Sequence, residues 1–346
     1  MRTPHRILVV RTDRLGDVVL ATPLIRSLRQ TFPSAFIAAM VRPYAKDILI
    51  NNPHLNEIVV DDDAKEGRGH SGFWRQVRTL RLLRFDTALL LLPTERAAWM
   101  LFFAGIPRRV GVGTKLYGVL TFMGRVSRNK YIPLRHEADY CMDLGRKIGV
   151  ESEDLTTEVF LTHEERAEGL RLLRSAGARD SCTLVGVHPG SGGSSPNWDG
   201  KRYAALVESL LANGQPDIRL VLTGEESNVP FPQSEGVIDL RGKLSLRELM
   251  AVLSHFHSFF SSSTGPMHIA AALKVPTVSM FCPLPACSPT LWGPKGNSAR
   301  IILPPEGFCE GRCPGDPKVC RFEEISVEVV ATTILETITT NSNVVS

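Results

Sequence analysis

Two carboxylates and two arginines are crowded into a short stretch near the N-terminus. Asp13 and Asp17 alternate with Arg11 and Arg14, and Gly16 directly precedes the second aspartate. A carboxylate with a raised pKa can take a proton from a hydroxyl group, and an arginine can hold an anion. Four charged side chains at this spacing are costly to hold together unless they pair or bind a ligand. We therefore take this stretch as the first candidate site.

The sequence on both sides of this stretch predicts the elements that position it. Residues 7–10 are apolar, as in a short buried strand, and apolar residues then recur at helical spacing from Val18 to Leu28. The charged stretch would thus follow the carboxyl end of a parallel strand and open a helix. Open α/β sheets bind their ligands at that end of the strands.

A strand-to-helix junction in the second half combines hydroxyl groups with a glycine. Ser263, Thr264 and Gly265 follow an apolar run, and Pro266 stands at the expected first position of a helix. Backbone N–H groups at a helix start, together with such hydroxyls, can hold an anion. His268 would lie in the first turn and face the same pocket. The alternative is a serine-rich cap on an ordinary core helix.

Two more strand ends carry polar groups. Residues 187–198 contain three closely spaced glycines around Ser191, which allow the backbone to approach a ligand. This loop matches neither a Walker A nor a dinucleotide fingerprint, so a nucleoside triphosphatase or an NAD enzyme is not predicted. Glu225 and Glu226 follow another strand and suit the hydroxyl groups of a ribose or sugar. All three segments lie at strand ends of one predicted domain, so we expect them to converge.

The composition is that of a globular protein with two domains. The 346 residues exceed one ordinary core, and 43% of them are hydrophobic and 22% charged. The longest apolar runs are too short for a membrane span and no signal peptide is recognised, so a cytoplasmic location is expected. Residues 1–160 carry 24 Lys and Arg against 17 Asp and Glu, a net charge of +7, and the remainder carries −3. This asymmetry predicts an anionic partner, either a phosphorylated substrate or an acidic membrane surface, rather than nucleic acid.

Strand-like runs alternate with helical patterns, which predicts an α/β protein with parallel, doubly wound sheets. The expected strands of the first half are residues 7–10, 36–41, 57–60, 87–92 and 109–112, with a helix at 73–83. Those of the second half are 184–187, 219–222, 258–261 and 277–281, with helices at 203–211, 246–253, 266–273 and 326–338.

The same pattern predicts the limits of the domains. Residues 1–160 and 161–325 are expected to form two domains facing a central cleft, which would hold the ligand, and residues 326–346 a final helix and tail. Residues 61–72 are polar and glycine-containing, as in a mobile loop, and 153–162 are interpreted as a linker. The last eight residues are expected to fray.

The cysteines divide into two groups. Three lie in or beside a loop rich in Gly and Pro and could hold a metal or stabilise that loop: Cys309, Cys313 and Cys320. Their spacing matches no standard zinc pattern and a fourth ligand would have to come from elsewhere, so structural cysteines are favoured. The other four are interpreted as reduced, scattered core or loop thiols: Cys141, Cys182, Cys282 and Cys287.

Two further groups of charged residues leave alternatives open. Four arginines recur every three residues: Arg75, Arg78, Arg81 and Arg84. This spacing predicts a solvated helix face, and a membrane-surface role is the alternative. A second group is explained equally by a functional site or by an exposed helix start with acids in its first turn: His136, Glu137 and Asp139.

Together, these segments resemble glycosyltransferase family 9, the ADP-heptose:lipopolysaccharide heptosyltransferases. The similarity extends over nearly the whole chain, and the order and spacing of the short motifs make it specific. It rests on residues 11–23, 188–198, 239–243, 263–273 and 291–294. The resemblance implies the GT-B fold, which consists of two Rossmann-like domains with a central cleft, and transfer of a sugar from an ADP-sugar without a cofactor or a metal.

The resemblance also implies roles for individual residues. Asp17 corresponds to the catalytic base, and the loop around it, with Arg11, Arg14 and Gly16, would face the acceptor. The positions of Thr264 and Gly265 correspond to the donor diphosphate site, with Ser263 and His268 beside it. Ser191 is similar to a hydroxyl residue that contacts the diphosphate, and Glu225 or Glu226 to a carboxylate near the donor ribose.

Two positions depart from the family pattern. Pro196 stands where a lysine is common, so a cation near the donor phosphates is missing, and Lys201 is a possible substitute. Some members have an aspartate at the position of Ser263.

The acceptor implied by the resemblance is a phosphorylated, Kdo-bearing lipid A core at the cytoplasmic face of the inner membrane, with peripheral membrane contact. The alternatives are an epimerase-like enzyme of the same fold and a non-catalytic protein that binds nucleotide sugars.

Overall fold

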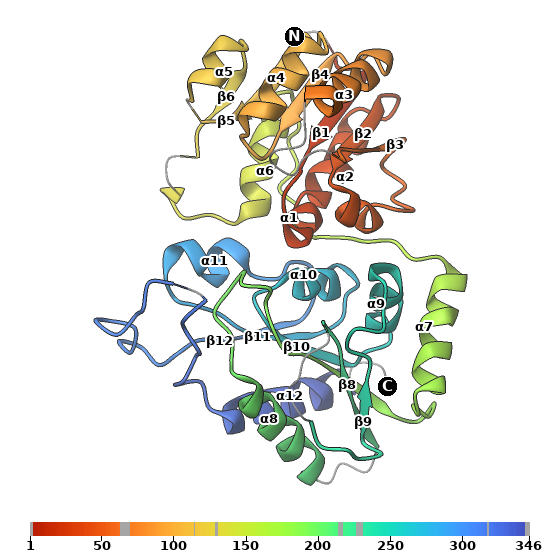
Figure 1. Cartoon of the computed structure of the whole chain (residues 1–346), viewed down its shortest axis with the longest axis vertical. Helices are drawn as coiled ribbons and strands as arrows, with labels where there is room; N and C mark the ends of the chain where they lie inside the picture. Colours follow the sequence, from red (N-terminus) through yellow and green to blue (C-terminus); the bar gives the residue numbers. More distant parts are fainter. Residues whose placement is uncertain are drawn as a thin grey trace. The chain divides into compact units, whose positions relative to one another are not determined.

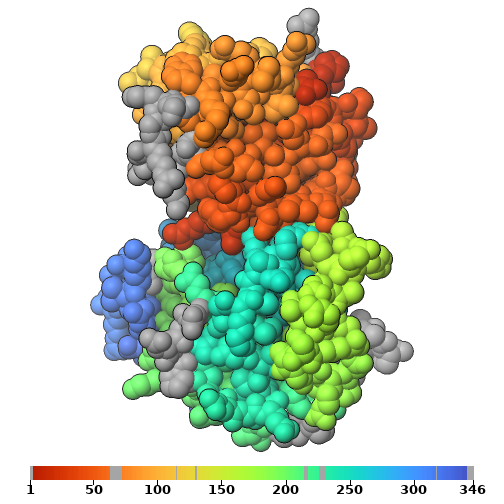
Figure 2. All heavy atoms as spheres, turned by 45° about the vertical axis from the view of Figure 1, so that its right-hand side comes forward, coloured from red at the N-terminus to blue at the C-terminus, as the bar shows by residue number. Residues whose placement is uncertain are grey.

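The computed structural model describes residues 3–62, 70–113, 115–128, 131–213, 217–225, 231–316 and 318–342. Contacts between Cα atoms divide the chain into two compact units, residues 1–160 and 161–346. Figure 1 shows the elements of each unit and Figure 2 the heavy atoms, in the same colours. Residues 151–162 contain neither helix nor strand. Each unit is described by itself below.

The N-terminal unit is built on one parallel sheet of six strands in the order β3-β2-β1-β4-β5-β6. The strands are β1 (Arg6–Val10), β2 (Phe36–Val41), β3 (Glu57–Val60), β4 (Thr87–Leu90), β5 (Arg108–Val112) and β6 (Gly124–Val126). The five expected strands are confirmed, although β4 ends at Leu90 rather than at residue 92. Strand β6, at the edge of the sheet, was not predicted.

Helices connect the strands of this sheet, as parallel pairing requires. They are α1 (Leu15–Leu20), α2 (Thr22–Thr31), η1 (Pro43–Ile48), α3 (His70–Leu82), α4 (Glu95–Phe103), α5 (Leu116–Leu120) and α6 (Glu137–Arg146). The predicted mobile loop at residues 61–72 is only partly described: α3 already begins at His70, and residues 63–69 lie outside the described residues.

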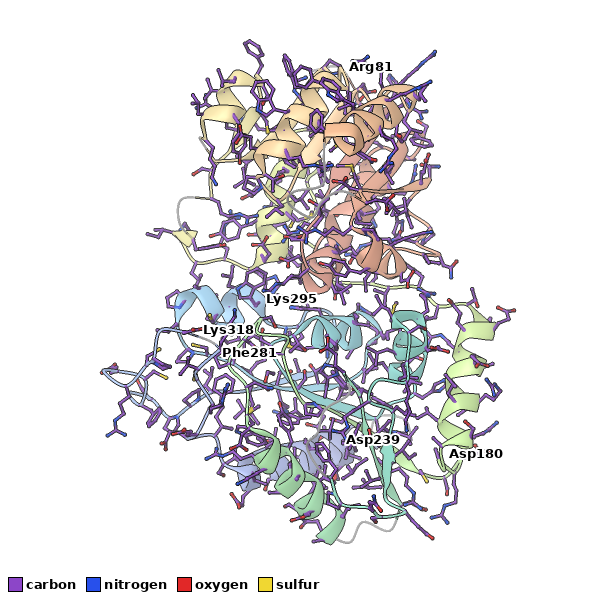
Figure 3. All side chains as sticks on the ribbon, viewed as in Figure 1. Arg81, Asp180, Asp239, Phe281, Lys295 and Lys318 are labelled. Carbon is purple, nitrogen blue, oxygen red and sulfur yellow. The ribbon has the colours of Figure 1, made fainter. Side chains whose placement is uncertain are left out.

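The C-terminal unit repeats the plan with the strand order β12-β11-β10-β7-β8-β9, again all parallel. The strands are β7 (Thr183–His188), β8 (Ile218–Leu222), β9 (Val237–Asp239), β10 (Ser258–Ser262), β11 (Thr277–Met280) and β12 (Ala299–Ile302). Figure 3 labels Asp239 at the end of β9. The four expected strands are present, and the edge strands β9 and β12 were not predicted.

The helices of this unit are α7 (His163–Ser175), α8 (Gly200–Ala212), α9 (Leu246–Leu253), α10 (Gly265–Ala272), η3 (Pro285–Cys287), α11 (Pro289–Trp292) and α12 (Val327–Ser342). Helix α12 continues four residues beyond the predicted end at residue 338, and 343–346 lie outside the described residues. Fraying was expected from residue 339 onward, and this stays a prediction.

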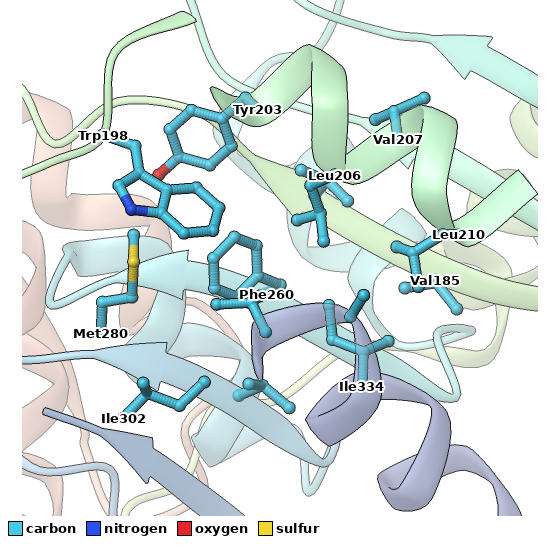
Figure 4. Packing of buried hydrophobic residues seen from close by; sticks show 14 of the residues in the cluster. Val185, Trp198, Tyr203, Leu206, Val207, Leu210, Phe260, Met280, Ile302 and Ile334 are labelled. Atoms are coloured by element: carbon cyan, nitrogen blue, oxygen red, sulfur yellow. The ribbon is translucent and has the colours of Figure 1, made fainter. Parts of the chain in front are cut away.

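An aromatic cluster anchors the loop after β7 to the core of the C-terminal unit (Figure 4). The ring of Trp198 packs on those of Tyr203 and Phe260, with centroids 5.6 and 5.7 Å away. The Trp198 indole donates to the carbonyl of Phe322, 3.3 Å away, and the Tyr203 hydroxyl to Oδ1 of Asn197, 2.6 Å away. Buried aromatic rings with satisfied polar groups stabilise a core strongly. The position of the loop is therefore set by the core beneath it.

In each unit the strand order reverses once. The reversal lies between β1 and β4 in the first sheet and between β7 and β10 in the second. Open α/β sheets bind ligands outside the carboxyl ends of the strands at such a point. The segments that follow β1, β7 and β10 are the candidate loops of the sequence, so the topology places each of them at a reversal point. Within the described ranges, no helix has the length and hydrophobicity needed to cross a bilayer.

Candidate functional site

A buried cluster of charges lies directly after β1. The guanidinium group of Arg11 pairs with Asp13 (Nε to Oδ1, 2.9 Å), with Glu137 (Nη1 to Oε1, 3.0 Å) and with Asp17. A second guanidinium group, that of Arg128, lies 3.2 Å from the same oxygen of Glu137. Arg11 and Glu137 are almost fully buried. Helix α6, about 126 residues further along the chain, thus holds the first candidate loop in place through Glu137.

The charges of this cluster do not balance when every group is ionised, because three carboxylates face two guanidinium groups. Burial raises the pKa of Asp13 to about 7; Arg11 lowers it, and the negative charge of Asp17 raises it further. When Asp13 is protonated, two carboxylates face two guanidinium groups and the cluster is neutral. Asp13 thus pairs within its own loop, with Arg11.

Asp17 lies in the first turn of α1, behind the buried Gly16. The side chain of Asp17 keeps 15% of its surface exposed while one oxygen contacts Arg11. A carboxylate near a helix start is stabilised by the backbone dipoles. Arg14, the residue before α1, is exposed and its side chain makes no cap hydrogen bond. Asp17 can therefore meet a ligand from solvent without leaving its partner.

The start of α6 is not an exposed helix start. His136 is buried and its Nδ1 accepts a hydrogen bond from the backbone N–H of Ala138 at 3.2 Å. Glu137 has no exposed surface and pairs with Arg11. The explanation by solvated acids is therefore wrong for Glu137. The same explanation fits Asp139 better, because this side chain is half-buried and forms ion pairs with Arg135 and Arg146.

In the C-terminal unit, the loops that follow β7 and β10 meet. The hydroxyl of Ser194 donates to the carbonyl of Ser263 at 3.3 Å, and the hydroxyl of Ser262 donates to Oδ1 of Asn197 at 2.5 Å. The third segment joins them through His188, whose Nδ1 lies 3.0 Å from Oγ1 of Thr223. The predicted convergence of the three strand ends is confirmed.

Two buried hydroxyl groups at this junction have no hydrogen-bond partner within the described part of the chain. They belong to Thr264, the residue that precedes α10, and to Ser195. Buried polar groups are nearly always paired, so such hydroxyls indicate a place for a ligand. Gly265 opens α10 and Pro266 is its second residue rather than its first, while His268 is buried in the first turn.

The loop after β7 has the backbone that its glycines allow. Gly190, Gly192 and Gly193 have φ values of 108°, 54° and 72°, which other residues rarely adopt. Within this loop the hydroxyl of Ser191 donates to the carbonyl of Ser195 at 2.8 Å. The fold of the loop thus leaves Ser191 beside an open cavity of about 390 Å³.

Two cations line this cavity that the sequence did not single out. Lys318 and Arg321 line it together with Ser191 (Lys318 is labelled in Figure 3). Lys201, the predicted substitute for the family lysine, is exposed in the first turn of α8 and is not among the described lining residues. The structure therefore offers Lys318 and Arg321 as the nearby positive charges.

The end of β8 carries the last candidate group. Burial lowers the pKa of His188 to about 4, so this imidazole is neutral at pH 7 and suited to hydrogen bonding with Thr223. Glu225 follows as an exposed residue, whereas Glu226 lies outside the described residues. The backbone N–H of Gly242 donates to the carbonyl of Gly224 at 2.8 Å, which joins the segment after β9 to the same edge.

Five of the seven cysteines line one cavity in the C-terminal unit, of about 280 Å³: Cys282, Cys287, Cys309, Cys313 and Cys320. The interpretation of Cys282 and Cys287 as scattered thiols is therefore wrong. A hydrogen bond from the Cys282 thiol lowers the pKa of Cys287 to about 7. All seven cysteines are free. Among the described residues, no three His, Cys, Asp or Glu side chains are placed to hold a metal ion.

Comparison with known proteins decides the family. Residues 73–311 match the model of glycosyltransferase family 9 (heptosyltransferase), which is more than half of the chain. The chain belongs to glycosyltransferase family 9. This glycosyltransferase is 25% identical to lipopolysaccharide heptosyltransferase 2 of Escherichia coli K12 over 319 residues, which cover 86% of this chain and 87% of the relative.

Two solved structures share the fold of this glycosyltransferase. A family 9 glycosyltransferase from Veillonella parvula DSM 2008 matches 96% of this chain and 97% of its own with a TM-score of 0.80 at 23% identity. The E. coli ADP-heptose LPS heptosyltransferase II matches 97% of this chain and 99% of its own with a TM-score of 0.77 at 20% identity. The expected GT-B fold class is confirmed.

Proposed function

We propose that this glycosyltransferase transfers a heptose from ADP-heptose to the inner core of lipopolysaccharide with inversion at the anomeric carbon, and that Asp17 is the general base. The observation that carries the proposal is the placement of Asp17, partly exposed and paired with Arg11 at the strand reversal of the first sheet. The E. coli relative, named as a lipopolysaccharide heptosyltransferase, supports the transferred sugar and the class of acceptor. The solved relative named for ADP-heptose supports the donor.

In the proposed step, an acceptor hydroxyl oxygen attacks the anomeric carbon of the heptose. The new carbon–oxygen bond forms as the bond to the diphosphate breaks, and the hydroxyl proton passes to Asp17. ADP leaves with the electron pair of the broken bond. A carboxylate is a weak base in water, but removal of water on substrate binding raises its pKa and improves the proton transfer.

The developing negative charge of ADP needs positive groups in the C-terminal unit. The backbone N–H groups at the start of α10, beside the unpartnered hydroxyl of Thr264, suit a diphosphate. Ser191 lies with Lys318 and Arg321 around the neighbouring cavity and supports the same role. We place the donor here, with Gly265 and His268 at the helix start and Glu225 or Glu226 toward the ribose.

The acceptor is assigned to the basic N-terminal unit, with Arg14 exposed beside Gly16. A phosphorylated, Kdo-bearing lipid A core supplies the anionic groups that the charge of +7 favours. Such a lipid would hold the enzyme at the cytoplasmic face of the inner membrane as a peripheral protein.

A nucleotide panel followed by a transfer assay tests this proposal. ADP should raise the melting temperature more than UDP, GDP or CMP at the same concentration, because a ligand that binds only the folded state stabilises it. Labelled heptose from ADP-heptose should then appear on Kdo-bearing lipid A. Stabilisation by UDP but not by ADP would contradict the donor. An isomerised donor without labelled acceptor would indicate the epimerase-like alternative, and ADP binding without donor consumption would indicate a non-catalytic binding protein.

The cation of the donor site can be identified separately. Lys318→Gln should weaken ADP binding between about 3- and 10-fold, which is the loss expected for one partly exposed charge-assisted contact. Lys201→Gln is the matched control and should leave the Kd for ADP unchanged, because Lys201 does not line the cavity. Isothermal titration calorimetry measures both. The reverse result, with Lys201→Gln weakened and Lys318→Gln unchanged, would return the role to Lys201.

A further inference from the structure

A continuous set of aromatic rings lies on the N-terminal unit, away from the charge cluster in sequence. Six rings from α3, α4 and the loop after α5 form a chain of contacts with centroids 5.2 to 6.4 Å apart: Phe73, Trp74, Trp99, Phe102, Phe103 and Phe122. We call these rings, with the exposed residues of α5 (Leu116, Val119 and Leu120), the aromatic face. Helix α4 packs against both α3 and α5, so the face is contiguous.

Much of the aromatic face is exposed rather than folded into the core. Trp74 keeps 52% of its surface accessible, Leu116 72% and Phe122 79%. Helix α5 has no buried residue, although four of its five residues are apolar or aromatic. The orange atoms of α3 and α4 lie at the surface of this unit in Figure 2. Contiguous apolar patches of this kind mark interaction surfaces in soluble proteins.

The backbone conformation at Phe122 holds the ring of this residue at the surface. Phe122 has a φ of 51°, a left-handed conformation that bulky residues rarely adopt. Arg109 holds this loop by donating to the carbonyl of Thr121 at 2.7 Å, and its guanidinium group lies 5.3 Å from the ring centroid of Phe102. The strained turn therefore presents the most exposed aromatic ring of the face to solvent.

The residues around the aromatic face are strongly basic. Between residues 70 and 128 the sequence has ten Lys and Arg and only two Asp and Glu, a net charge of +8. The exposed members include Arg78 on α3, Lys115 before α5 and Arg125 on β6. Figure 3 labels Arg81, on the same helix as Trp74. Trp, Phe and Leu among exposed Lys and Arg are the composition of a surface that inserts into the interface of an anionic bilayer.

We infer that the aromatic face, with its basic surroundings, docks this glycosyltransferase onto an anionic lipid bilayer. The rings and the leucines of α5 enter the headgroup region, while the arginines and lysines contact lipid phosphates. The inference deepens the proposed function, because a lipid-linked acceptor is found at such a surface, but the face itself is argued only from its own residues. It takes up the membrane-surface alternative for the basic side chains of residues 75–84, three of which lie on α3.

Flotation of the purified full-length protein with vesicles tests the inference. Phosphatidylcholine vesicles are compared with vesicles that also contain phosphatidylglycerol, at low and at high salt, without donor or acceptor. The wild type should float with the anionic vesicles, and high salt should reduce binding. The triple variant Trp74→Ser, Leu116→Ser, Phe122→Asn should lower the partition coefficient about tenfold or more. Its matched control replaces exposed apolar residues of the other unit, Leu303→Ser, Val319→Ser and Val329→Ser, and should bind as the wild type does.

A variant with fewer positive charges measures the electrostatic contribution to vesicle binding. Arg78→Gln, Lys115→Gln and Arg125→Gln together should lower binding to anionic vesicles about tenfold. The control variant should bind anionic vesicles as the wild type does. It carries three substitutions on the surface of the other unit: Arg171→Gln, Arg174→Gln and Arg179→Gln. Melting temperatures show that each variant is folded.

Quenching of tryptophan fluorescence by brominated lipids gives a second measurement. Wild-type fluorescence should be quenched through Trp74 and Trp99, since the other two tryptophans, Trp198 and Trp292, belong to the C-terminal unit. Absence of flotation by the wild type, or equal flotation of the apolar variant and its control, would overturn the inference. So would self-association that the apolar variant abolishes without any lipid quenching, because the face would then bind a second copy. Neither readout depends on heptose transfer, so failure of the proposed donor or acceptor leaves the vesicle result standing.

Discussion

Asp17→Asn should lower kcat by at least about a hundredfold, the usual effect of removing a general base. The amide keeps the size of the side chain and its hydrogen-bonding capacity but cannot accept the acceptor's proton. Because Asp17 does not belong to the C-terminal unit where the donor is placed, the Kd for ADP should stay unchanged. Single-turnover transfer from ADP-heptose measures the first effect and calorimetry the second. Wild-type turnover in a folded Asp17→Asn protein would remove Asp17 from the mechanism.

Asp13→Asn is the matched control for this prediction. Asp13 contacts the same guanidinium group, and its pKa is raised to about 7, so it is the competing candidate for the base. If Asp17 is the base, Asp13→Asn should keep activity within about tenfold. Any inflection of kcat/KM near pH 7 that comes from Asp13 should disappear in Asp13→Asn, because burial raises the pKa of that carboxyl to about 7. A collapse of activity in Asp13→Asn alone would exchange the two roles.

Arg11→Met should destabilise the N-terminal unit by about 3 to 5 kcal/mol, the range expected when one partner of a buried ion pair is removed. The methionine fills similar space, but Asp13 and Asp17 then lose their ion pairs with Arg11, and among the described residues Glu137 keeps its pair with Arg128. Hydrogen–deuterium exchange of the β1 and α6 backbone amides reports the loss in this unit alone, which a global unfolding curve of a two-unit protein does not.

Two comparisons make the Arg11 result specific. Adding Glu137→Leu to Arg11→Met should restore part of the lost protection, because it removes a buried charge that has lost a partner. Arg171→Met removes an exposed ion pair with Glu168 and should leave exchange almost unchanged. Equal protection in Arg11→Met and wild type would show that the cluster does not stabilise the unit.

The strands of both sheets could be predicted where they are buried on both faces. Residues 7–10, 36–41 and 184–187 are nearly continuous apolar runs, which parallel central strands require. The edge strands β6, β9 and β12 have only three or four residues and include glycine or charged side chains. Such short segments acquire strand structure from pairing with a neighbour rather than from their own sequence, so no local pattern distinguishes them from loops.

The site was predictable to the extent that it follows strand ends. The loops after β1, β7, β8 and β10 were found because polar residues and glycines interrupt an apolar pattern there. Lys318 was missed because it reaches the site from a segment more than a hundred residues away along the chain. Glu137 was left open between a functional site and an exposed helix start, because its partner Arg11 is equally distant in sequence. For Glu137 one signal existed: it shares a helix face with Cys141, which also contacts Arg11 and is buried.

The pairing of Arg11 with Glu137 joins the loop after the first strand of the N-terminal unit to the last helix of that unit. During synthesis the loop with Asp17 therefore emerges long before the carboxylate that completes its surroundings. A nascent chain that stops short of α6 has all the residues of this loop, yet Arg11 lacks Glu137, its partner on the last helix. If Asp17 is the base, activity therefore requires completion of the whole unit, and a truncated translation product would carry the motif without its surroundings.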